Sequence, residues 1–390
     1  MKIPLFNKGM ILEKAKYKRV IIKVGSSSLM GDDLSVREEV FDAIMKNFKV
    51  LKEMSVEPCL VTSGAIALGR NVLKLDKKPR DMGLKQACAA VGQAKLMEYY
   101  NKYAEKYSLT LGQILVNHDD FQIRNRTTHL TDTLDSMYKC GIIPVINEND
   151  ALSVDEIKVG DNDTLASLIT PMVGADLLIL FSDIDGLYDK DPKKNKDAAL
   201  IDFVDKIDDK LYSFASGSTS SVGTGGMETK LNAAVISTAA GSDMIICNSR
   251  EIDRLADIVF GYKTGTFFKR GKGVSSREHW IIFKTNSAGS VSVDDGLVEA
   301  LKDKKISVLP MGITGVSGKF DKGAVVEVIA PSGKTIGKGI TKFSSDEIAL
   351  IKGKKGGEIS EKLGYKCKIE VIHANDLVTL SEDFYGRIVK

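Results

Sequence analysis

The sequence predicts a large α/β domain, a three-layer α/β/α sandwich with a mainly parallel sheet, followed by a small β-barrel-like domain. Apolar runs of strand length alternate with helical patterns over the first two thirds of the chain, which is typical of successive βα units. The run at 176–181 (DLLILF) is almost continuously apolar, as expected of a strand buried on both faces of a parallel sheet. After residue 262 the composition shifts to Gly, Lys and Ser, and short apolar runs lie between glycine turns, a pattern typical of small β domains.

The order of patterns in the first part indicates helices on both faces of one sheet. Strands are expected at residues 19–24, 57–61, 109–116, 142–146, 176–181 and 243–247. Helices are expected at residues 36–54, 83–107, 125–139, 162–173, 227–241 and 251–259.

The second part is predicted to begin after a linker. We expect an N-terminal extension at 1–16, the α/β domain at 17–262, a linker at 263–277 and the β domain at 278–390. Short strands are expected at residues 280–283, 290–293, 306–309, 324–329, 335–339, 348–351 and 367–371, with one helix at 296–302.

The bulk composition is that of an ordinary globular protein. The 390 residues are 43% hydrophobic and 27% charged, which is enough apolar material for a sizeable core. A formal charge of +3 does not by itself indicate a nucleic-acid partner. The 5 cysteines are widely spaced without a CxxC pair, and the 4 histidines are scattered, which favours a reducing compartment and no structural zinc. No segment has the apolar run of a signal peptide or a membrane span, so we expect a cytoplasmic protein.

An acidic, amide-rich segment at 144–163 (PVINENDALSVDEIKVGDND) organises the predicted α/β domain. It continues the strand expected at 142–146, and Lys158 is its one cation. Open α/β sheets bind ligands just beyond the carboxyl ends of their strands. Clustered carboxylates repel one another unless a metal, a substrate ammonium or a lysine lies among them. The alternative is a solvated surface loop, but the Asn-Glu-Asn-Asp run and the turn before a helical pattern favour a site.

Two lysines adjoin small-residue turns. Lys23 lies in the apolar strand at 19–24, directly before Gly25 and three serines. A buried lysine is costly unless an anion meets it, although an edge lysine can also extend to water. The glycine-rich stretch at 216–230 leads into a helical pattern with Lys230 in its first turn, which indicates a phosphate cradle rather than a flexible linker. Neither GxxxxGK[ST] nor GxGxxG occurs in the chain, so the cradle is not a P-loop or a dinucleotide fingerprint.

This combination of groups fits phosphoryl transfer to a carboxylate. Lysines and backbone N–H groups suit the oxygens of a transferring phosphoryl group, and carboxylates suit Mg²⁺ or a substrate ammonium. No Cys–His or Ser–His pair suggests an activated nucleophile. A carboxylate substrate is already ionised at neutral pH because its pKa is about 4. It can therefore attack phosphorus directly, and the protein needs only to position groups and neutralise charge.

The sequence resembles the glutamate 5-kinases of the amino-acid kinase superfamily over about residues 17–364. The motifs that carry the resemblance lie at residues 22–27 (IKVGSS), 61–66 (VTSGAI), 144–150 (PVINEND), 157–163 (IKVGDND) and 223–230 (GTGGMETK). The part after residue 280 is similar to the PUA domain that some of these kinases carry, at residues 293–296, 307–310 and 312–318.

The resemblance implies that ATP, with Mg²⁺, phosphorylates the γ-carboxylate of L-glutamate to give L-glutamyl 5-phosphate, the first step of proline synthesis. Lys23 and Lys230 would stabilise the phosphoryl group, and Asp163 would hold both lysines. Glutamate would be bound by Lys23, Ser63, Asp150 and Asn162. ATP would be bound by Lys23, Ser182, Asp183, Thr224, Gly225, Gly226, Met227, Glu228, Thr229 and Lys230. Lys158 and Gly25 are further candidates, and no metal ligand is assigned.

The resemblance further implies proline as a feedback inhibitor and a homo-oligomer, either a dimer or a tetramer. Ser182 stands where many relatives have Thr, and either residue supplies a hydroxyl. The segment before residue 17 has no matching motif.

Two alternatives stay open at this point. The chain could be another carboxylate kinase of the superfamily, acting on acetylglutamate or aspartate. It could also be an RNA-binding protein that acts through the PUA-like part, with the lysine clusters at 302–305 and 352–355 as phosphate contacts. That part lacks an evident aromatic stacking series of the kind that readers of single-stranded RNA use, and lysine clusters are usually solvated.

Overall fold

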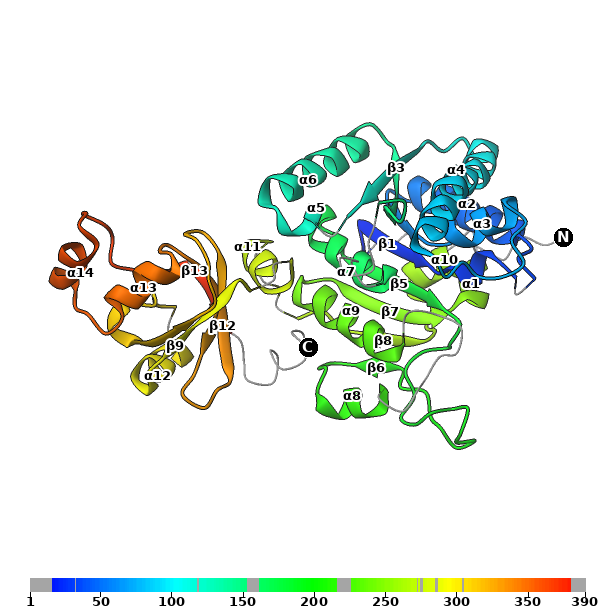
Figure 1. Cartoon of the computed structure of the whole chain (residues 1–390). Coiled ribbons are helices and arrows are strands. Elements are labelled where there is room, and N and C mark those ends of the chain that lie inside the picture. The colour runs from blue at the N-terminus through cyan, green and yellow to red at the C-terminus, as the bar shows by residue number, and fades with distance from the viewer. Residues whose placement is uncertain are drawn as a thin grey trace.

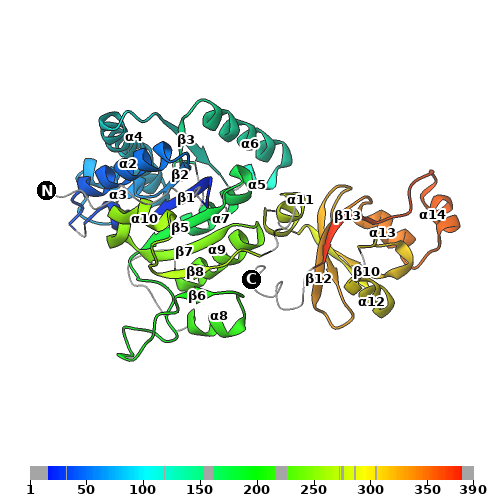
Figure 2. The same ribbon diagram turned by 180° about the vertical axis from the view of Figure 1, so that it is seen from behind.

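The chain forms two domains, each with its own sheet (Figures 1 and 2). The computed structural model describes residues 16–31, 33–117, 119–152, 161–215, 226–271, 273, 276–284, 287–303 and 305–379. The candidates Lys158, Thr224 and Gly225 and most of the predicted extension at 1–16 lie outside these residues. None of the helices within these ranges is long and apolar enough to cross a membrane.

The larger domain is built on a mainly parallel sheet, as predicted. The described residues form an eight-stranded sheet in the order β3-β4-β2-β1-β5-β7-β8-β6. Its only antiparallel pairing among the described strands joins β7 and β8. The strands are β1 (Arg19–Val24), β2 (Glu57–Thr62), β3 (Leu111–Val116), β4 (Ile143–Glu148), β5 (Leu177–Ser182), β6 (Phe203–Val204), β7 (Asp243–Asn248) and β8 (Thr266–Phe268).

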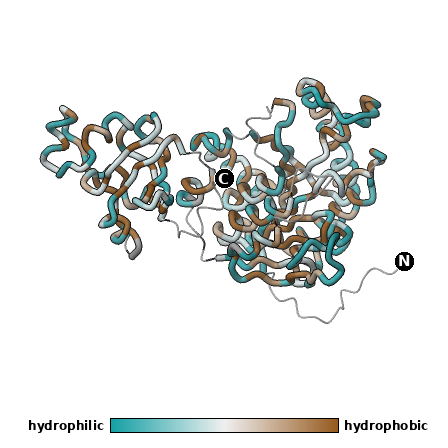
Figure 3. Tube along the Cα trace, turned by 60° about the horizontal axis from the view of Figure 1, so that its bottom comes forward, coloured by the Kyte–Doolittle hydropathy of each residue, from teal (hydrophilic) through white to brown (hydrophobic). Residues whose placement is uncertain are grey.

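Helices cover both faces of this sheet, so the three-layer prediction is confirmed. One apolar core lies between the sheet and α2, α3, α4 and α10, and the other lies between the sheet and α5, α6, α7, α8 and α9. The helices are α1 (Ser26–Leu29), α2 (Glu38–Glu53), α3 (Ala65–Val72), α4 (Met82–Lys106), α5 (Asp119–Gln122), α6 (Arg124–Lys139), α7 (Asn162–Val173), α8 (Asp209–Ala215), α9 (Met227–Ala239), η2 (Ser249–Arg254) and α10 (Leu255–Val259). Apolar segments gather in the interior of each domain (Figure 3).

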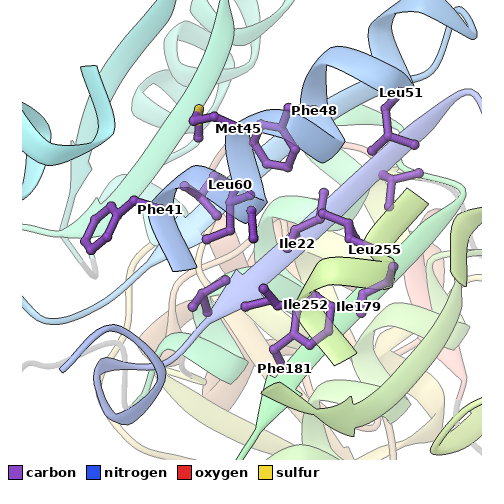
Figure 4. Packing of buried hydrophobic residues seen from close by; sticks show 14 of the residues in the cluster. Ile22, Phe41, Met45, Phe48, Leu51, Leu60, Ile179, Phe181, Ile252 and Leu255 are labelled. Carbon is purple, nitrogen blue, oxygen red and sulfur yellow. The ribbon is translucent and has the colours of Figure 1, made fainter. Parts of the chain in front are cut away.

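The alternation of side chains along β1 decides which core each residue enters, because successive residues of a strand point to opposite faces. Val20, Ile22 and Val24 belong to the core under α2 and α10, where Ile22 lies in one cluster with Phe48 and Leu255 (Figure 4). Ile21 belongs to the opposite core, which contains α7 and α9. Lys23 shares the face of Ile21 and is therefore directed toward these two helices.

Helices α3 and α4 touch through glycines at their crossing. A Cβ on Gly92 of α4 would lie 1.7 Å from the carbonyl oxygen of Ala65 and 2.4 Å from the amide nitrogen of Gly69. A Cβ on Gly69 of α3 would lie 1.8 Å from the carbonyl oxygen of Cys88. Only glycine therefore allows the two backbones to come this close.

Replacing Gly92 with alanine is expected to destabilise the protein by roughly 1–3 kcal/mol, because the added methyl group forces two packed backbones apart. Urea unfolding measures the change. The matched control is Gly357→Ala in the first turn of α14 (Gly356–Leu363), where an added Cβ meets nothing within 4 Å, so that helix propensity alone makes the change neutral or slightly stabilising. Equal midpoints for wild type and Gly92→Ala would contradict the packing argument.

The described residues of the second domain form a separate five-stranded sheet in the order β10-β9-β11-β12-β13. All its pairings are antiparallel except that of β11 with β9. The strands are β9 (Gly289–Val293), β10 (Ile313–Ser317), β11 (Val325–Ile329), β12 (Thr335–Thr341) and β13 (Ile372–Thr379), with α12 (Asp295–Asp303), η4 (Pro310–Gly312), α13 (Ser345–Ile351) and α14 beside them.

Four strand predictions in this domain are wrong. Residues 280–283 lie in a π-helical turn, η3 (Trp280–Lys284), which follows α11 (Ser276–His279). Residues 348–351 end α13, whose start is fixed by a capping box in which Ser344 and Glu347 bond each other's backbone. Residues 367–371 precede the strand β13, and residues 306–309 contribute only an isolated bridge of Val308 with Ile372. Short apolar runs do not distinguish a strand from a buried helical turn.

The sheet of the larger domain extends beyond residue 262. Strand β8 pairs with β7 and lies within the segment 263–277 that the sequence predicts as a linker. Farther on, Ile281 and Ile282 of η3 pack with Val325 and Val378 of the second sheet. The division into 17–262 and 278–390 stays a prediction.

Candidate active site

Two lysines and one aspartate form a buried ionic cluster at the carboxyl end of β1. Lys23 Nζ lies 2.5 Å from Asp163 Oδ1, and Lys230 Nζ lies 3.0 Å from Asp163 Oδ2. The exposed fractions of the side chains are 12% for Lys23, 7% for Lys230 and 1% for Asp163. The three residues that the sequence predicts to be catalytic therefore lie together, with one carboxylate between two ammonium groups.

The local sequence explains why these side chains meet. Asp163 lies in the first turn of α7, which begins where Asp161 caps the helix by accepting a hydrogen bond of 2.8 Å from the Thr164 amide. Lys230 lies in the first turn of α9, after the N-cap Gly226. Both helix N-termini therefore approach Lys23, and each adds the partial positive charge of its unpaired N–H groups to this edge of the sheet.

The electrostatics of the cluster keep Asp163 ionised. Burial raises the pKa of a carboxyl group, but the ammonium groups of Lys23 and Lys230 outweigh burial here and lower the pKa of Asp163 below its ordinary value of 3.8. The cluster then carries two positive charges and one negative charge. Its net positive charge suits an anionic phosphoryl group.

A chain of carboxamides lies beside this cluster. Asn162 Nδ2 donates to the Thr62 carbonyl oxygen at 2.5 Å, to Ser63 Oγ at 2.7 Å and to Asn147 Oδ1 at 3.0 Å. Asn147 Nδ2 in turn donates to Gln93 Oε1 at 2.9 Å. The structure thus brings together Ser63 and Asn162, two of the residues that the sequence predicts to bind glutamate.

A further member of the predicted glutamate site, Asp150, and the additional candidate Gly25 lie on neighbouring elements. Asp150 lies in the turn directly after β4. Because β4 pairs in parallel with β2, the strand that Ser63 follows, Asp150 lies at the same edge of the sheet as Ser63. Gly25 is the N-cap of α1, and a Cβ there would lie 3.7 Å from Lys23 Nζ. A glycine at this position leaves the approach to that ammonium group open.

A cleft opens between the turn after β5 and the N-terminus of α9. Its walls include Asp183, Gly226, Met227 and Lys230 of the predicted ATP set, together with the apolar and aromatic side chains of Ile184, Leu187, Tyr188 and Phe214. Ser182, at the end of β5, donates a hydrogen bond of 3.1 Å to Asp183. Because Lys230 lines the cleft and also pairs with Asp163, the cleft adjoins the ionic cluster.

Two residues of the predicted ATP set point elsewhere. Glu228 is exposed, and Thr229 Oγ1 donates back to the Gly226 carbonyl oxygen at 2.8 Å within the first turn of α9. Neither belongs to the walls of the cleft.

The sequence did not single out Asp185, which lies between two residues of the cleft wall, Ile184 and Gly186. Asp185 accepts hydrogen bonds from Asn248 at 2.8 Å, from Arg250 at 2.9 Å and from Tyr188 at 3.1 Å. Burial raises the pKa of Asp185, but these hydrogen bonds and the Arg250 charge lower it on balance. The Asp185-Gly186 turn directly after a predicted strand was the available signal.

Comparisons with known proteins agree with this geometry. Residues 18–248 match the Amino acid kinase family, and residues 289–363 match the PUA domain. A glutamate 5-kinase of Caldanaerobacter subterraneus subsp. tengcongensis is 42% identical over 94% of this chain and 100% of its own length. A glutamate 5-kinase of Citrifermentans bemidjiense is 43% identical over 94% of this chain and 98% of its own length.

Among solved structures, the isopentenyl phosphate kinase product complex of T. acidophilum is 16% identical, with a TM-score of 0.44, over 64% of this chain and 100% of that one. The matched domains and the full-length relatives assign the family. The chain belongs to the amino acid kinase family and, within it, to the glutamate 5-kinases.

Proposed function

We propose that this chain transfers the γ-phosphoryl group of ATP to the γ-carboxylate of L-glutamate, which gives L-glutamyl 5-phosphate and ADP, the first step of proline synthesis. One observation supports this most strongly. The cluster of Lys23, Asp163 and Lys230 lies between the Ser63–Asn162 hydrogen bonds on one side and the cleft lined by Lys230 and Asp183 on the other. An acceptor and a nucleotide can therefore meet across the two ammonium groups.

The reaction needs no general base. A γ-carboxylate oxygen of glutamate forms the new bond to phosphorus, and the bond from that phosphorus to the bridging oxygen of ADP breaks. Lys23 and Lys230 neutralise the negative charge on the transferring group. Asp163 holds the two ammonium groups in place, so that little reorganisation is required during the reaction.

Mg²⁺ fits the donor set as a companion of the nucleotide. Within the described residues, no group of three or more His, Cys, Asp or Glu side chains could hold a metal ion. Magnesium usually binds through one or two carboxylates together with substrate phosphates. Asp183 lines the cleft and is the carboxylate that we propose to hold the ion, whose charge would screen the phosphate oxygens.

Formation of an acyl phosphate, trapped as the hydroxamate with hydroxylamine, tests the proposed function. Glutamate, N-acetylglutamate and aspartate are offered side by side with ATP and Mg²⁺. We expect a signal with glutamate alone. A signal with another acid instead would support phosphoryl transfer to a carboxylate but would show that glutamate is not the substrate. No signal with any of the three acids would reject the proposed function.

Replacing Asp150 with asparagine is expected to raise the KM for glutamate by about tenfold or more with a smaller change in kcat, because its proposed partner is the α-ammonium of the substrate. Initial rates at varied glutamate and saturating ATP measure this. Asp205→Asn is the control, since Asp205 pairs only with an exposed lysine, Lys269, among the described residues. A saturation curve for Asp150→Asn that overlays the wild-type curve would remove Asp150 from the glutamate site.

Two further properties follow from the family resemblance as proposals, and a third follows from the cysteines. Proline would act as a feedback inhibitor, which titration of the hydroxamate assay with proline checks. The chain would form a dimer or a tetramer, which light scattering measures. A cytoplasmic location fits the five cysteines, all of which are free thiols.

A further inference from the structure

The carboxamide chain beside the ionic cluster ends in a residue that the proposed mechanism does not use. Gln93 lies in the middle of α4 and is 9% exposed, and Asn147 is 2% exposed. Gln93 Oε1 accepts from Asn147, whereas Gln93 Nε2 is buried and has no hydrogen-bond partner among the described residues. An unpaired buried donor costs stability. An apolar side chain at residue 93 would avoid this cost, but it would offer Asn147 no acceptor.

A single carbonyl group fixes the orientation of all three amides. The Thr62 carbonyl oxygen can only accept, so the Asn162 atom that faces it at 2.5 Å must be Nδ2. The atom of Asn147 that faces this nitrogen at 3.0 Å must then be Oδ1. Asn147 therefore directs Nδ2 toward Gln93, which has to supply an acceptor. The unpaired Nε2 of Gln93 is the consequence of that requirement.

The orientation decides what Asn162 offers to a ligand. Its Nδ2 group already faces three acceptors, namely Thr62 O, Ser63 Oγ and Asn147 Oδ1. Its remaining polar atom, Oδ1, is an acceptor. A substrate ammonium group is a donor and matches this oxygen, whereas a substrate carboxylate does not.

The packing of α4 holds Gln93 at this place. The adjacent Gly92 lets α4 lie against the backbone of Ala65 and Gly69 in α3. Helix α3 begins directly after Ser63 and Gly64. The same helix contact therefore positions both ends of the chain of hydrogen bonds.

We propose that Gln93 is a positioning residue for the acceptor substrate. Through Asn147 it fixes the Asn162 carboxamide with Oδ1 available for the α-ammonium group of glutamate. This inference rests on the proposed function, since it takes glutamate as the ligand of Asn162. Gln93 itself touches neither substrate.

The test compares variants that remove or keep the acceptor at residue 93. Gln93→Met keeps the length of the side chain but removes the acceptor, and we expect a three- to tenfold rise in the KM for glutamate, of the size of one lost hydrogen bond. The KM for ATP should stay within twofold of wild type. Gln93→Glu keeps an oxygen acceptor whether or not it is protonated, and the KM for glutamate should return to within about twofold of wild type. Gln93→Ala is made in parallel in case the methionine variant does not fold, and its expected rise is the same.

Asn47→Leu is the matched control. Asn47 is a buried amide of α2 that donates to the Ala43 carbonyl oxygen at 2.8 Å and accepts from the Ala256 amide at 2.9 Å, so it takes no part in the carboxamide chain. Its loss should lower the melting temperature without changing the KM for glutamate.

If the wild-type enzyme is active and the folded Gln93→Met or Gln93→Ala variant has the wild-type KM for glutamate, the role of Gln93 is overturned and the proposed function stands. The same holds if Gln93→Glu raises this KM as much as Gln93→Met does. A wild-type chain without glutamate-dependent turnover would overturn the proposed function as well.

Discussion

Replacing Lys230 with methionine is expected to lower kcat by about 10²–10³-fold while the KM for glutamate changes by less than about threefold. Lys230 Nζ is held 3.0 Å from Asp163 and also lines the cleft, so we expect its charge to act on the transferring phosphoryl group. Methionine has a similar length and fills the buried space, but it has no charge to oppose the charge that develops in the transition state. Steady-state kinetics with each substrate varied in turn measure the effect.

The control for this variant is Lys106→Met. Lys106 is an exposed residue of α4 that pairs with Asp42 at 2.6 Å, and a surface ion pair contributes only about 0–1 kcal/mol to stability. Its kcat should equal that of wild type. A Lys230→Met enzyme with normal kcat and a large rise in the KM for glutamate would show that Lys230 binds the acceptor instead.

Replacing Asp163 with asparagine is expected to destabilise the fold by about 3–5 kcal/mol, because two largely buried ammonium groups lose the anion between them. Activity should fall with stability, since neither lysine is then held in position. Urea unfolding at pH 7 measures the difference in free energy. The control is Asp205→Asn, whose carboxylate is 66% exposed and whose loss should change stability by less than about 1 kcal/mol.

The contribution of Asp163 has a definite pH dependence. Its pKa is lower in the folded chain than the ordinary value of 3.8, so the unfolded chain binds the proton more tightly. The stabilisation is then fully present above the unfolded-state pKa and is lost as the pH falls through the folded-state pKa. The gap in unfolding free energy between wild type and Asp163→Asn should therefore narrow in acid below about pH 4 and stay constant at higher pH. A gap that widened in acid would contradict the assignment.

Much of the candidate site could be predicted from the sequence because its charged residues stand in segments where a charge is unusual. Lys23 lies in an otherwise apolar strand, Lys230 follows a glycine-rich stretch, and Asp163 lies in an acidic run after a buried strand. Each of these is costly unless a partner is present. The alternation along β1 in the structure puts Lys23 on the face of Ile21, the face that α7 and α9 cover.

The sequence could not reveal the role of Gln93, because a glutamine in a helical pattern breaks no rule. Its role depends on the crossing of α3 and α4 at Gly69 and Gly92, a contact between residues that are distant in the chain. The second domain shows a similar limit. The apolar run at 348–351 is equally consistent with a strand. It lies in helix α13, and the Ser344 cap determines where this helix starts.

The most direct test of direct attack by the substrate carboxylate uses glutamate labelled with ¹⁸O in both γ-carboxylate oxygens. The wild-type enzyme converts it with ATP in the presence of hydroxylamine, which attacks the acyl carbon of the product and releases phosphate. If the carboxylate oxygen attacks phosphorus, the released phosphate carries one ¹⁸O and the hydroxamate retains the other. Unlabelled phosphate, with or without hydroxamate, would contradict this mechanism, because the bond to phosphorus would then not have been formed by the glutamate oxygen.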